Sequence, residues 1–159
     1  MSGPERPRFA ADEMLGSLAK WLRIMGYDTS YCKGMEDREI TLAASSEGRR
    51  LLTRDKDLAK RSTGSTYVES DVLEEQVMQV VQKFDLHFEQ RFTRCAICNG
   101  NLDQVEKDSV LDEVPPRSLQ MTDEFYRCSS CGKVYWKGTH WKNMMERMAD
   151  FGVQDRSLL

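Results

Sequence analysis

The sequence lacks three features that would place the protein in a membrane, in a secretory pathway or among strongly basic nucleic-acid binders. It has no run of about 18 consecutive apolar residues, the length that a helix needs to cross a bilayer. Its first residues, Met1 to Arg8, include no apolar stretch of the kind found in secretory signals. With 23 Lys and Arg against 26 Asp and Glu, the net charge is -3, so any nucleic-acid binding must depend on local basic groups. We therefore expect a cytoplasmic protein with no membrane partner.

The cysteines are few, and their spacing argues against disulfides. Four of the five form two Cys-x-x-Cys pairs, Cys95 with Cys98 and Cys128 with Cys131, separated by 29 residues. In a reducing compartment such pairs favour a metal site, and four thiolates complete the tetrahedral shell of a structural Zn²⁺. An iron centre is the less favoured alternative. The fifth, Cys32, is expected to be a small buried apolar side chain.

The first half of the chain alternates short apolar runs with segments of helical period, a pattern typical of a parallel sheet with crossover helices. Helical spacing places Met14 and Leu42 on buried faces and Val72 inside the fourth helix. Four strand–helix units are thus expected, with strands at residues 9–11, 29–32, 51–53 and 66–68, and helices over 14–25, 37–47, around 58 and over 71–84.

After Phe92 this periodicity ends. The chain continues as the first cysteine pair, a polar loop with Pro115 and Pro116, the second cysteine pair and a helix over residues 141–151. We therefore expect two domains, an α/β domain over residues 1–92 and a small zinc ribbon with a C-terminal helix over residues 93–159.

Acidic residues follow two of the expected strands and open one helix. Asp12 follows the first strand, Asp55 and Asp57 follow the third, and Glu36 and Asp37 begin the second helix. Parallel strands end at one edge of the sheet, where such folds bind ligands, so these carboxylates could hold Mg²⁺ or Mn²⁺ for phosphodiester hydrolysis. The alternative is helix capping, worth about 1 kcal/mol per cap.

Basic residues lie beside these acids and, interleaved with aromatics, around the second cysteine pair. Such a pattern suits a surface that contacts phosphates and stacks bases, although a solvated helix face and ribbon packing are the alternatives. The RNA-binding candidates are Arg54, Lys56, Arg127, Lys133, Trp136, Lys137 and Lys142.

Several of these segments resemble the Mut-seven C-terminal ribonuclease family. They are the acidic motif DEMLGSLAKWLR at residues 12–23, GYDT at 26–29, LLTRD at 51–55 and the segment DEFYRC at 123–128 continuing to Trp136. They occur in the family's order and cover almost the whole chain. The resemblance implies a PIN-like three-layer domain with a central parallel sheet, a joined zinc ribbon and a metal-dependent RNase site. By position, Asp12 and Asp55 match the family's acids, and Asp57 and one of Glu36 or Asp37 are further candidates.

Three functions fit these features. The first is a metal-dependent ribonuclease acting on single-stranded RNA, an endonuclease, with Asp12, Asp37, Asp55 and Asp57 as catalytic acids and with Mg²⁺ or Mn²⁺ on Asp12 and Asp55. The second is a non-catalytic module whose zinc ribbon binds RNA or protein. The third is a receiver-like phosphoacceptor domain, which ranks last because no suitable lysine follows a later strand and because it leaves the ribbon unexplained.

Overall fold

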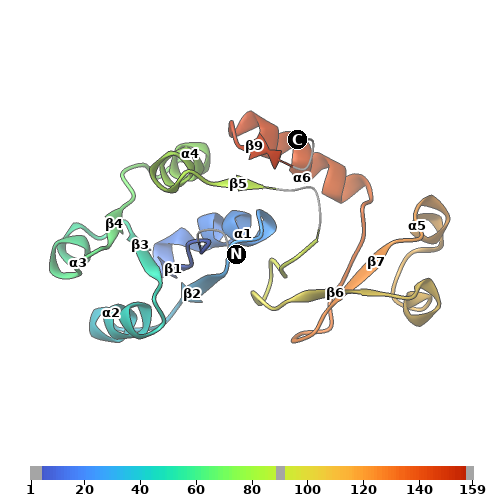
Figure 1. Ribbon diagram of the computed structural model, residues 1–159, viewed down its shortest axis with the longest axis horizontal. Coiled ribbons are helices and arrows are strands. Elements are labelled where there is room, and N and C mark those ends of the chain that lie inside the picture. The colour runs from blue at the N-terminus through green and yellow to red at the C-terminus, as the bar shows by residue number, and fades with distance from the viewer. Residues whose placement is uncertain (1–4, 89–91, 157–159) are drawn as a thin grey trace.

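A computed structural model describes residues 5–88 and 92–156, and Figure 1 shows its arrangement. Residues 1–4 and 89–91 of the expected first domain, and 157–159 of the second, lie outside the described residues. Four parallel strands form one sheet in the order β2-β1-β3-β4. Their bounds are β1 Phe9–Asp12, β2 Thr29–Cys32, β3 Arg50–Thr53 and β4 Thr66–Tyr67.

A helix follows each strand, which confirms the four expected strand–helix units. The helices are α1 Gly16–Ile24, preceded by the 3-10 turn η1 Glu13–Leu15, then α2 Asp37–Ser46, α3 Lys56–Arg61 and α4 Leu73–Phe84.

Side chains of the central strands alternate between two apolar cores, because successive strand residues point to opposite faces. Phe9 and Leu52 join the core built by α1 and α4. Ala10 and Leu51 join the core built by α2 and α3, which also buries Cys32 as expected. The domain therefore has three layers, and the expected α/β class with a central parallel sheet is confirmed.

Three residues expected within apolar helix faces are exposed instead. Met14 is 66% exposed because it lies in the 3-10 turn before α1, where the helical phase of α1 does not apply. Leu42 is 60% exposed because it stands two positions from both Ile40 and Ala44, on the opposite side of α2. Val72 is 46% exposed and forms the extended N-cap of α4 rather than part of the helix.

The ribbon is a three-stranded antiparallel sheet in the order β6-β7-β8. It consists of β6 Leu102–Val105, β7 Phe125–Cys128 and β8 Val134–Tyr135. The segment between β6 and β7, expected to be a polar loop, contains the 3-10 turn η2 Lys107–Val110 and the helix α5 Pro116–Met121. Val110 and Val114 from this segment pack on Phe125, so three dispersed apolar residues form a small core that their spacing did not reveal.

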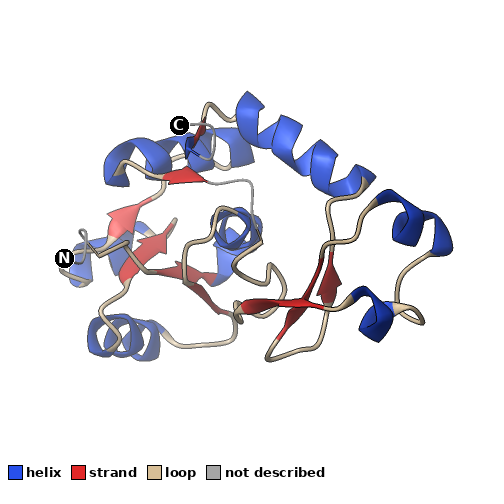
Figure 2. Cartoon of the chain, turned by 45° about the vertical axis from the view of Figure 1, so that its right-hand side comes forward, coloured by secondary structure: helices blue, strands red, loops and turns tan. Residues whose placement is uncertain are grey.

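The C-terminal helix packs against the first domain. Helix α6, Thr139–Asp150, leads to β9 Gln154–Asp155, which pairs in parallel with β5 His87–Phe88. Phe151 is buried in the α1 core and meets Trp21 edge-on, with ring centroids 5.0 Å apart. Figure 2 shows this helix reaching from the ribbon back to the first domain. The division at residue 92 stays a prediction. None of the helices within residues 5–88 and 92–156 has the length and apolar character needed to span a membrane.

Replacing Phe151 with Ala tests this attachment. The ring is fully buried, so Phe151→Ala should lower the free energy of unfolding by about 3–5 kcal/mol through the loss of apolar burial and the cavity left behind. Urea unfolding followed by tryptophan fluorescence measures the change, and Met78→Ala, at a 42% exposed position on α4, is the control. Equal stabilities of the two variants would contradict the packing of α6 on the α/β core.

Candidate functional site

Asp12, the last residue of β1, and Asp55, which follows β3, lie at the point where the strand order of the sheet reverses. β1 pairs with β2 on one side and with β3 on the other. The crossover helices α1 and α2 cover opposite faces of the sheet. Ligands of open parallel sheets bind in the crevice that such a reversal leaves at the carboxyl ends of the strands. Asp12 and Asp55 are thus placed where this type of fold forms sites.

Thr53 links these two acids by hydrogen bonds. Its hydroxyl Oγ1 donates to Asp12 Oδ2 at 2.8 Å and accepts the backbone N–H of Asp55 at 3.0 Å. The Thr53 side chain is buried at the end of β3, so both bonds are held in a fixed geometry. Thr53 was not among the site residues predicted from the sequence. The sequence feature that could have indicated it is a hydroxyl residue at the end of a strand whose two preceding residues are apolar.

Both acids also cap helical turns, as the alternative interpretation expected. Asp12 Oδ1 accepts the Glu13 N–H at 2.8 Å, and Asp55 Oδ1 accepts the N–H groups of Asp57 at 2.9 Å and Leu58 at 3.1 Å. An ionised carboxylate offers about four lone-pair sites, so these bonds leave acceptor capacity on both acids. Capping and metal binding are therefore compatible at these positions.

The other two catalytic candidates are placed differently. Asp37 is the first residue of α2, preceded by the N-cap Glu36, and its Oδ2 lies 2.8 Å from Arg61 Nη2. Of the two acids that begin this helix, Glu36 rather than Asp37 is therefore the cap. Asp57 lies exposed in the first turn of α3. Within residues 5–88 and 92–156, the carboxylates do not form a group of three or more potential metal ligands; the four cysteines do.

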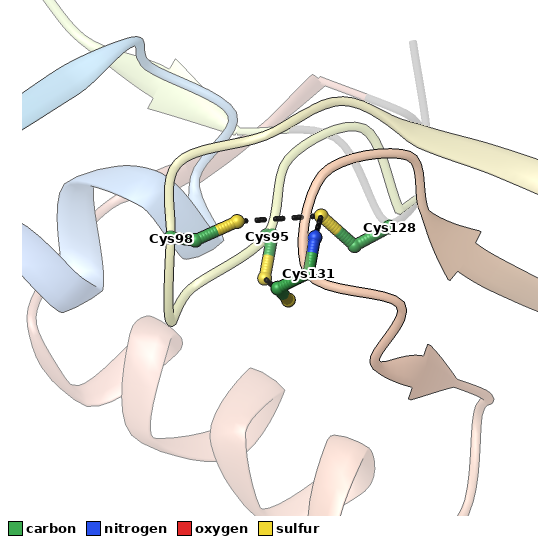
Figure 3. A group of neighbouring side chains, drawn as sticks. All are labelled: Cys95, Cys98, Cys128 and Cys131. Atoms are coloured by element: carbon green, nitrogen blue, oxygen red, sulfur yellow. Dashed lines mark hydrogen bonds between the residues drawn. The ribbon is translucent and has the colours of Figure 1, made fainter.

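The ligand atoms of Cys95, Cys98, Cys128 and Cys131 all lie within 4.8 Å of one another, as Figure 3 shows. The Sγ–Sγ distances are 3.7 Å from Cys95 to Cys131 and 3.3 Å from Cys98 to Cys128, and none of the five cysteines forms a disulfide. Tetrahedral Zn–S bonds of about 2.3 Å imply Sγ–Sγ distances of about 3.8 Å. The cluster can therefore hold one metal ion, in agreement with a zinc ribbon.

Neighbouring groups favour the thiolate form of two cysteines. Burial raises the pKa of Cys128, but the backbone N–H groups of Cys131 and Ser130 outweigh it and lower this pKa to about 6. Burial also raises the pKa of Cys95, but hydrogen bonds, first that with the Tyr135 hydroxyl 3.0 Å from its Sγ, outweigh burial, and the pKa of Cys95 is lowered overall. By contrast, burial and the hydrogen bond with Cys128 raise the pKa of Cys98 to about 12. Thiolates are the metal-binding form of cysteine, so Cys95 and Cys128 are the two sulfurs that their surroundings prepare for a cation.

The first cysteine loop is docked on the α/β domain by polar groups. The buried Arg23 guanidinium donates from Nη1 to the carbonyls of Ala96 and Ile97, both at 3.2 Å. Asn99 accepts the Thr29 N–H at 2.9 Å and donates to Asp28 Oδ1 at 2.7 Å. These residues were not predicted from the sequence, because their partners lie about 70 positions away.

The RNA-binding candidates differ in how freely they can reach a ligand. Arg127 pairs with Glu113 and donates to the Gly132 carbonyl, so its guanidinium is already engaged. Lys142 is exposed on α6.

The remaining candidates lie against carbonyls or rings. Arg54 Nη2 donates to the Glu69 carbonyl at 3.3 Å, and the Trp136 ring packs on Phe125 with centroids 6.3 Å apart. The three lysines each lie over an aromatic ring: the distance from Nζ to the ring centroid is 5.9 Å for Lys56 and Tyr67, 5.6 Å for Lys133 and Tyr135, and 5.0 Å for Lys137 and Trp141.

One comparison with known proteins gives a match. A family model described as the Mut7-C RNAse domain matches residues 7–148, which is most of the 159-residue chain. The match includes the cysteine cluster and the sheet edge that carries Asp12 and Asp55, here called the acidic edge. No curated protein and no solved structure matches.

We predict one tightly bound Zn²⁺ per chain on the four clustered cysteines. Cys128→Ser should release it, because a hydroxyl replaces one of four thiolates, whereas Cys32→Ser should retain it because Cys32 lies in the separate α2 core. Structural zinc contributes about 10–16 kcal/mol in small fingers, so the Cys128 variant should also lose ribbon structure. Elemental analysis under reducing conditions provides the measurement, and equal zinc contents in the two variants would reject the assignment.

Proposed function

Because the chain belongs to the Mut7-C RNAse domain family, we propose that it is a metal-dependent ribonuclease that cuts single-stranded RNA at the sheet edge carrying Asp12 and Asp55. The observation that carries this proposal is the hydrogen-bonded series from Asp12 through Thr53 to Asp55. Asp12 ends β1 and Asp55 follows β3, so both acids belong to the sheet edge at which parallel sheets bind ligands. We propose internal cleavage, so that the enzyme acts as an endonuclease.

The donor set at this edge suits a hard divalent cation, because Mg²⁺ and Mn²⁺ prefer carboxylate oxygens. Asp12 and Asp55 would hold the cation, with Asp37 and Asp57 as further catalytic acids. When bound, such a cation lowers the pKa of water and offsets the charge of the phosphate. The Thr53 hydroxyl donates to Asp12 and so fixes the orientation of that carboxylate. Arg54 and Lys56 flank Asp55 and supply positive charge for the RNA backbone.

The ribbon has a separate role in this proposal. A structural zinc holds its two cysteine loops, and the basic and aromatic side chains beyond them help to bind RNA. Lys133, Lys137 and Lys142 contribute charge and Trp136 contributes stacking surface. Arg127 is assigned a structural contribution through its ion pair with Glu113 as well as any contact with RNA.

A second candidate function is supported by the caps at Asp12 and Asp55. Both carboxylates have a structural use in the fold, so a non-catalytic module that binds RNA or protein through its ribbon would keep the same acids. The two functions differ in one measurable respect, which is metal-stimulated cleavage by the purified protein.

The first prediction for the acidic edge concerns Asp12 and Asp55. Asp12→Asn and Asp55→Asn should each abolish Mn²⁺- or Mg²⁺-stimulated cleavage of labelled single-stranded RNA, because each removes a charged metal ligand. Both should remain folded, since Asn caps a helix about as well as Asp, with stability within about 1 kcal/mol of wild type. Product lengths separate internal from terminal cleavage.

The control is Asp150→Asn, which removes an exposed charge at the end of α6. Zinc content should be equal in all proteins, so that loss of activity is not loss of the ribbon. Full activity in both Asp12→Asn and Asp55→Asn would exclude the proposed site and favour the binding module.

The second prediction concerns the ribbon. Replacing Lys133, Lys137 and Lys142 together with Ala should weaken RNA binding and flatten its salt dependence, because each phosphate that is no longer neutralised removes about 0.7 from the logarithmic salt slope on a single strand. Fluorescence anisotropy over a salt series measures both quantities. An unchanged affinity and slope would leave the ribbon as a structural brace or a protein-docking surface.

A further inference from the structure

A cavity of about 410 Å³ lies where the ribbon meets α1 and α6. Its walls come from Lys20 and Ile24 of α1, from residues 92–97 around the first cysteine loop, from residues 133–136 and from the start of α6. Figure 3 shows α1 in faint blue and α6 in faint red beside the cysteine loops. The volume falls in the range of about 300–1,000 Å³ that holds small ligands.

The charge of the cavity is opposite to that of the chain. Among the described residues that line it, Lys20, Arg94 and Lys133 are basic and none is Asp or Glu. The whole chain has 26 acidic residues and a net charge of -3. A concave surface lined by one sign of charge attracts ligands of the other, so the charged side chains of this cavity favour an anionic ligand.

The apolar part of the lining combines aliphatic side chains with aromatic rings. Trp136 and Trp141 both face the cavity and both are partly buried. Trp141 packs on Phe92 with ring centroids 6.2 Å apart, and Lys137 Nζ lies 5.0 Å from its ring. Aromatic faces beside cations match the two halves of a nucleotide, a flat base and a phosphate.

The position of the Trp136 ring is fixed by the backbone beside it. A Cβ at Gly138 would lie 2.9 Å from Trp136 Nε1, so the absence of a side chain there allows the indole to approach the chain. The ring also packs against Phe125, with the ring centroids 6.3 Å apart. An aromatic surface held in this way loses little conformational freedom when a ligand binds.

We propose that this cavity is a nucleotide-binding pocket that holds one unpaired nucleotide of the RNA, with its base against Trp136 and Trp141 and its phosphate beside Lys20 and Lys133. The inference rests on the proposed ribonuclease function and adds a substrate subsite to it. Helix α1 lies between this pocket and the acidic edge: the turn η1 joins Asp12 to Gly16, and the lining residues Lys20 and Ile24 lie about 6 and 12 Å beyond Gly16 along the helix axis. We therefore assign the nucleotide held here to a position beside the one that is cut, rather than to the cleaved position itself.

The test uses the full chain and a labelled single-stranded RNA with Mg²⁺ and Mn²⁺ omitted, so that binding is measured without cleavage. Trp141→Ala should weaken binding roughly 5- to 150-fold, the range expected when a base loses its stacking partner. Trp141→Phe, which retains an aromatic ring, should restore most of the affinity. Zinc content and circular dichroism verify that each variant is folded.

The cationic side of the pocket has a matched pair of lysines. Lys20→Ala should weaken binding and lower the logarithmic salt slope by about 0.7. Lys83→Ala should change neither quantity, because Lys83 is an exposed helical lysine on α4 that also lies near an aromatic ring, Phe84, but outside the cavity. The comparison separates a pocket contact from a general effect of net charge.

A mononucleotide provides a direct probe. A ribonucleoside 5′-monophosphate should quench tryptophan fluorescence in the wild type and much less in Trp141→Ala, whereas inorganic phosphate should not quench it. Wild-type affinity in folded Trp141→Ala and Lys20→Ala, or absence of quenching by the mononucleotide, would overturn the pocket and favour another occupant such as an apolar peptide of a protein partner. These binding measurements do not depend on cleavage. Failure of the ribonuclease proposal would appear in a different measurement, as the absence of metal-stimulated cleavage by the wild type.

Discussion

The buried guanidinium of Arg23 joins the α/β domain to the loop of the first cysteine pair, and the placement of the cysteine cluster beside helix α1 depends on this contact. Only 9% of Arg23 is exposed, and its Nε donates to the Thr29 carbonyl at 2.8 Å while Nη1 reaches the loop of the first cysteine pair. Burial lowers the pKa of Arg23, and the nearby Cys98 and Cys95 oppose this change. A buried charge is costly unless it is hydrogen-bonded and compensated. The carbonyls of Ala96 and Ile97 accept hydrogen bonds from the Arg23 guanidinium, and the same bonds hold the cysteine loop against α1.

A second contact fixes the same loop from the other side. The Asp28 carboxylate accepts bonds from Arg49 Nη1 at 2.8 Å and from Asn99 Nδ2 at 2.7 Å. Burial raises the pKa of Asp28, but these two donors outweigh it and the pKa is lowered overall. Because the folded pKa is below the unfolded value, this stabilisation is present above the unfolded pKa and is lost as the pH falls through the folded pKa. Acid therefore acts on the docking of the cysteine loop as well as on its thiolates.

The elements with regular apolar spacing were predictable from the sequence, and so was the cysteine cluster. The local periodicity of apolar residues predicts four strands and their helices. The spacing of the two Cys-x-x-Cys pairs predicts that their four cysteines are the ligands of one metal site. The positions of Asp12 and Asp55 at one sheet edge follow from strand order. By contrast, the role of Thr53 is revealed only by its hydrogen bond to Asp12 on the neighbouring strand β1. The small core that includes Val110, Val114 and Phe125 is formed by apolar residues far apart in the sequence. Tertiary contacts of this kind leave no local pattern.

Helix α1 relates the two proposed RNA-binding regions to one another. The turn η1 joins its first residue to Asp12, and its middle packs in the main core. Arg23 near its end holds the cysteine loop, and Ile24 lines the cavity beside the ribbon. At the acidic edge, carboxylates repel a phosphate backbone until a cation neutralises them. The cavity at the other end of α1 is lined by basic side chains and attracts the same backbone. Under the proposed function, a rigid helix thus sets a fixed spacing between the place where RNA is attracted and the place where it is cut.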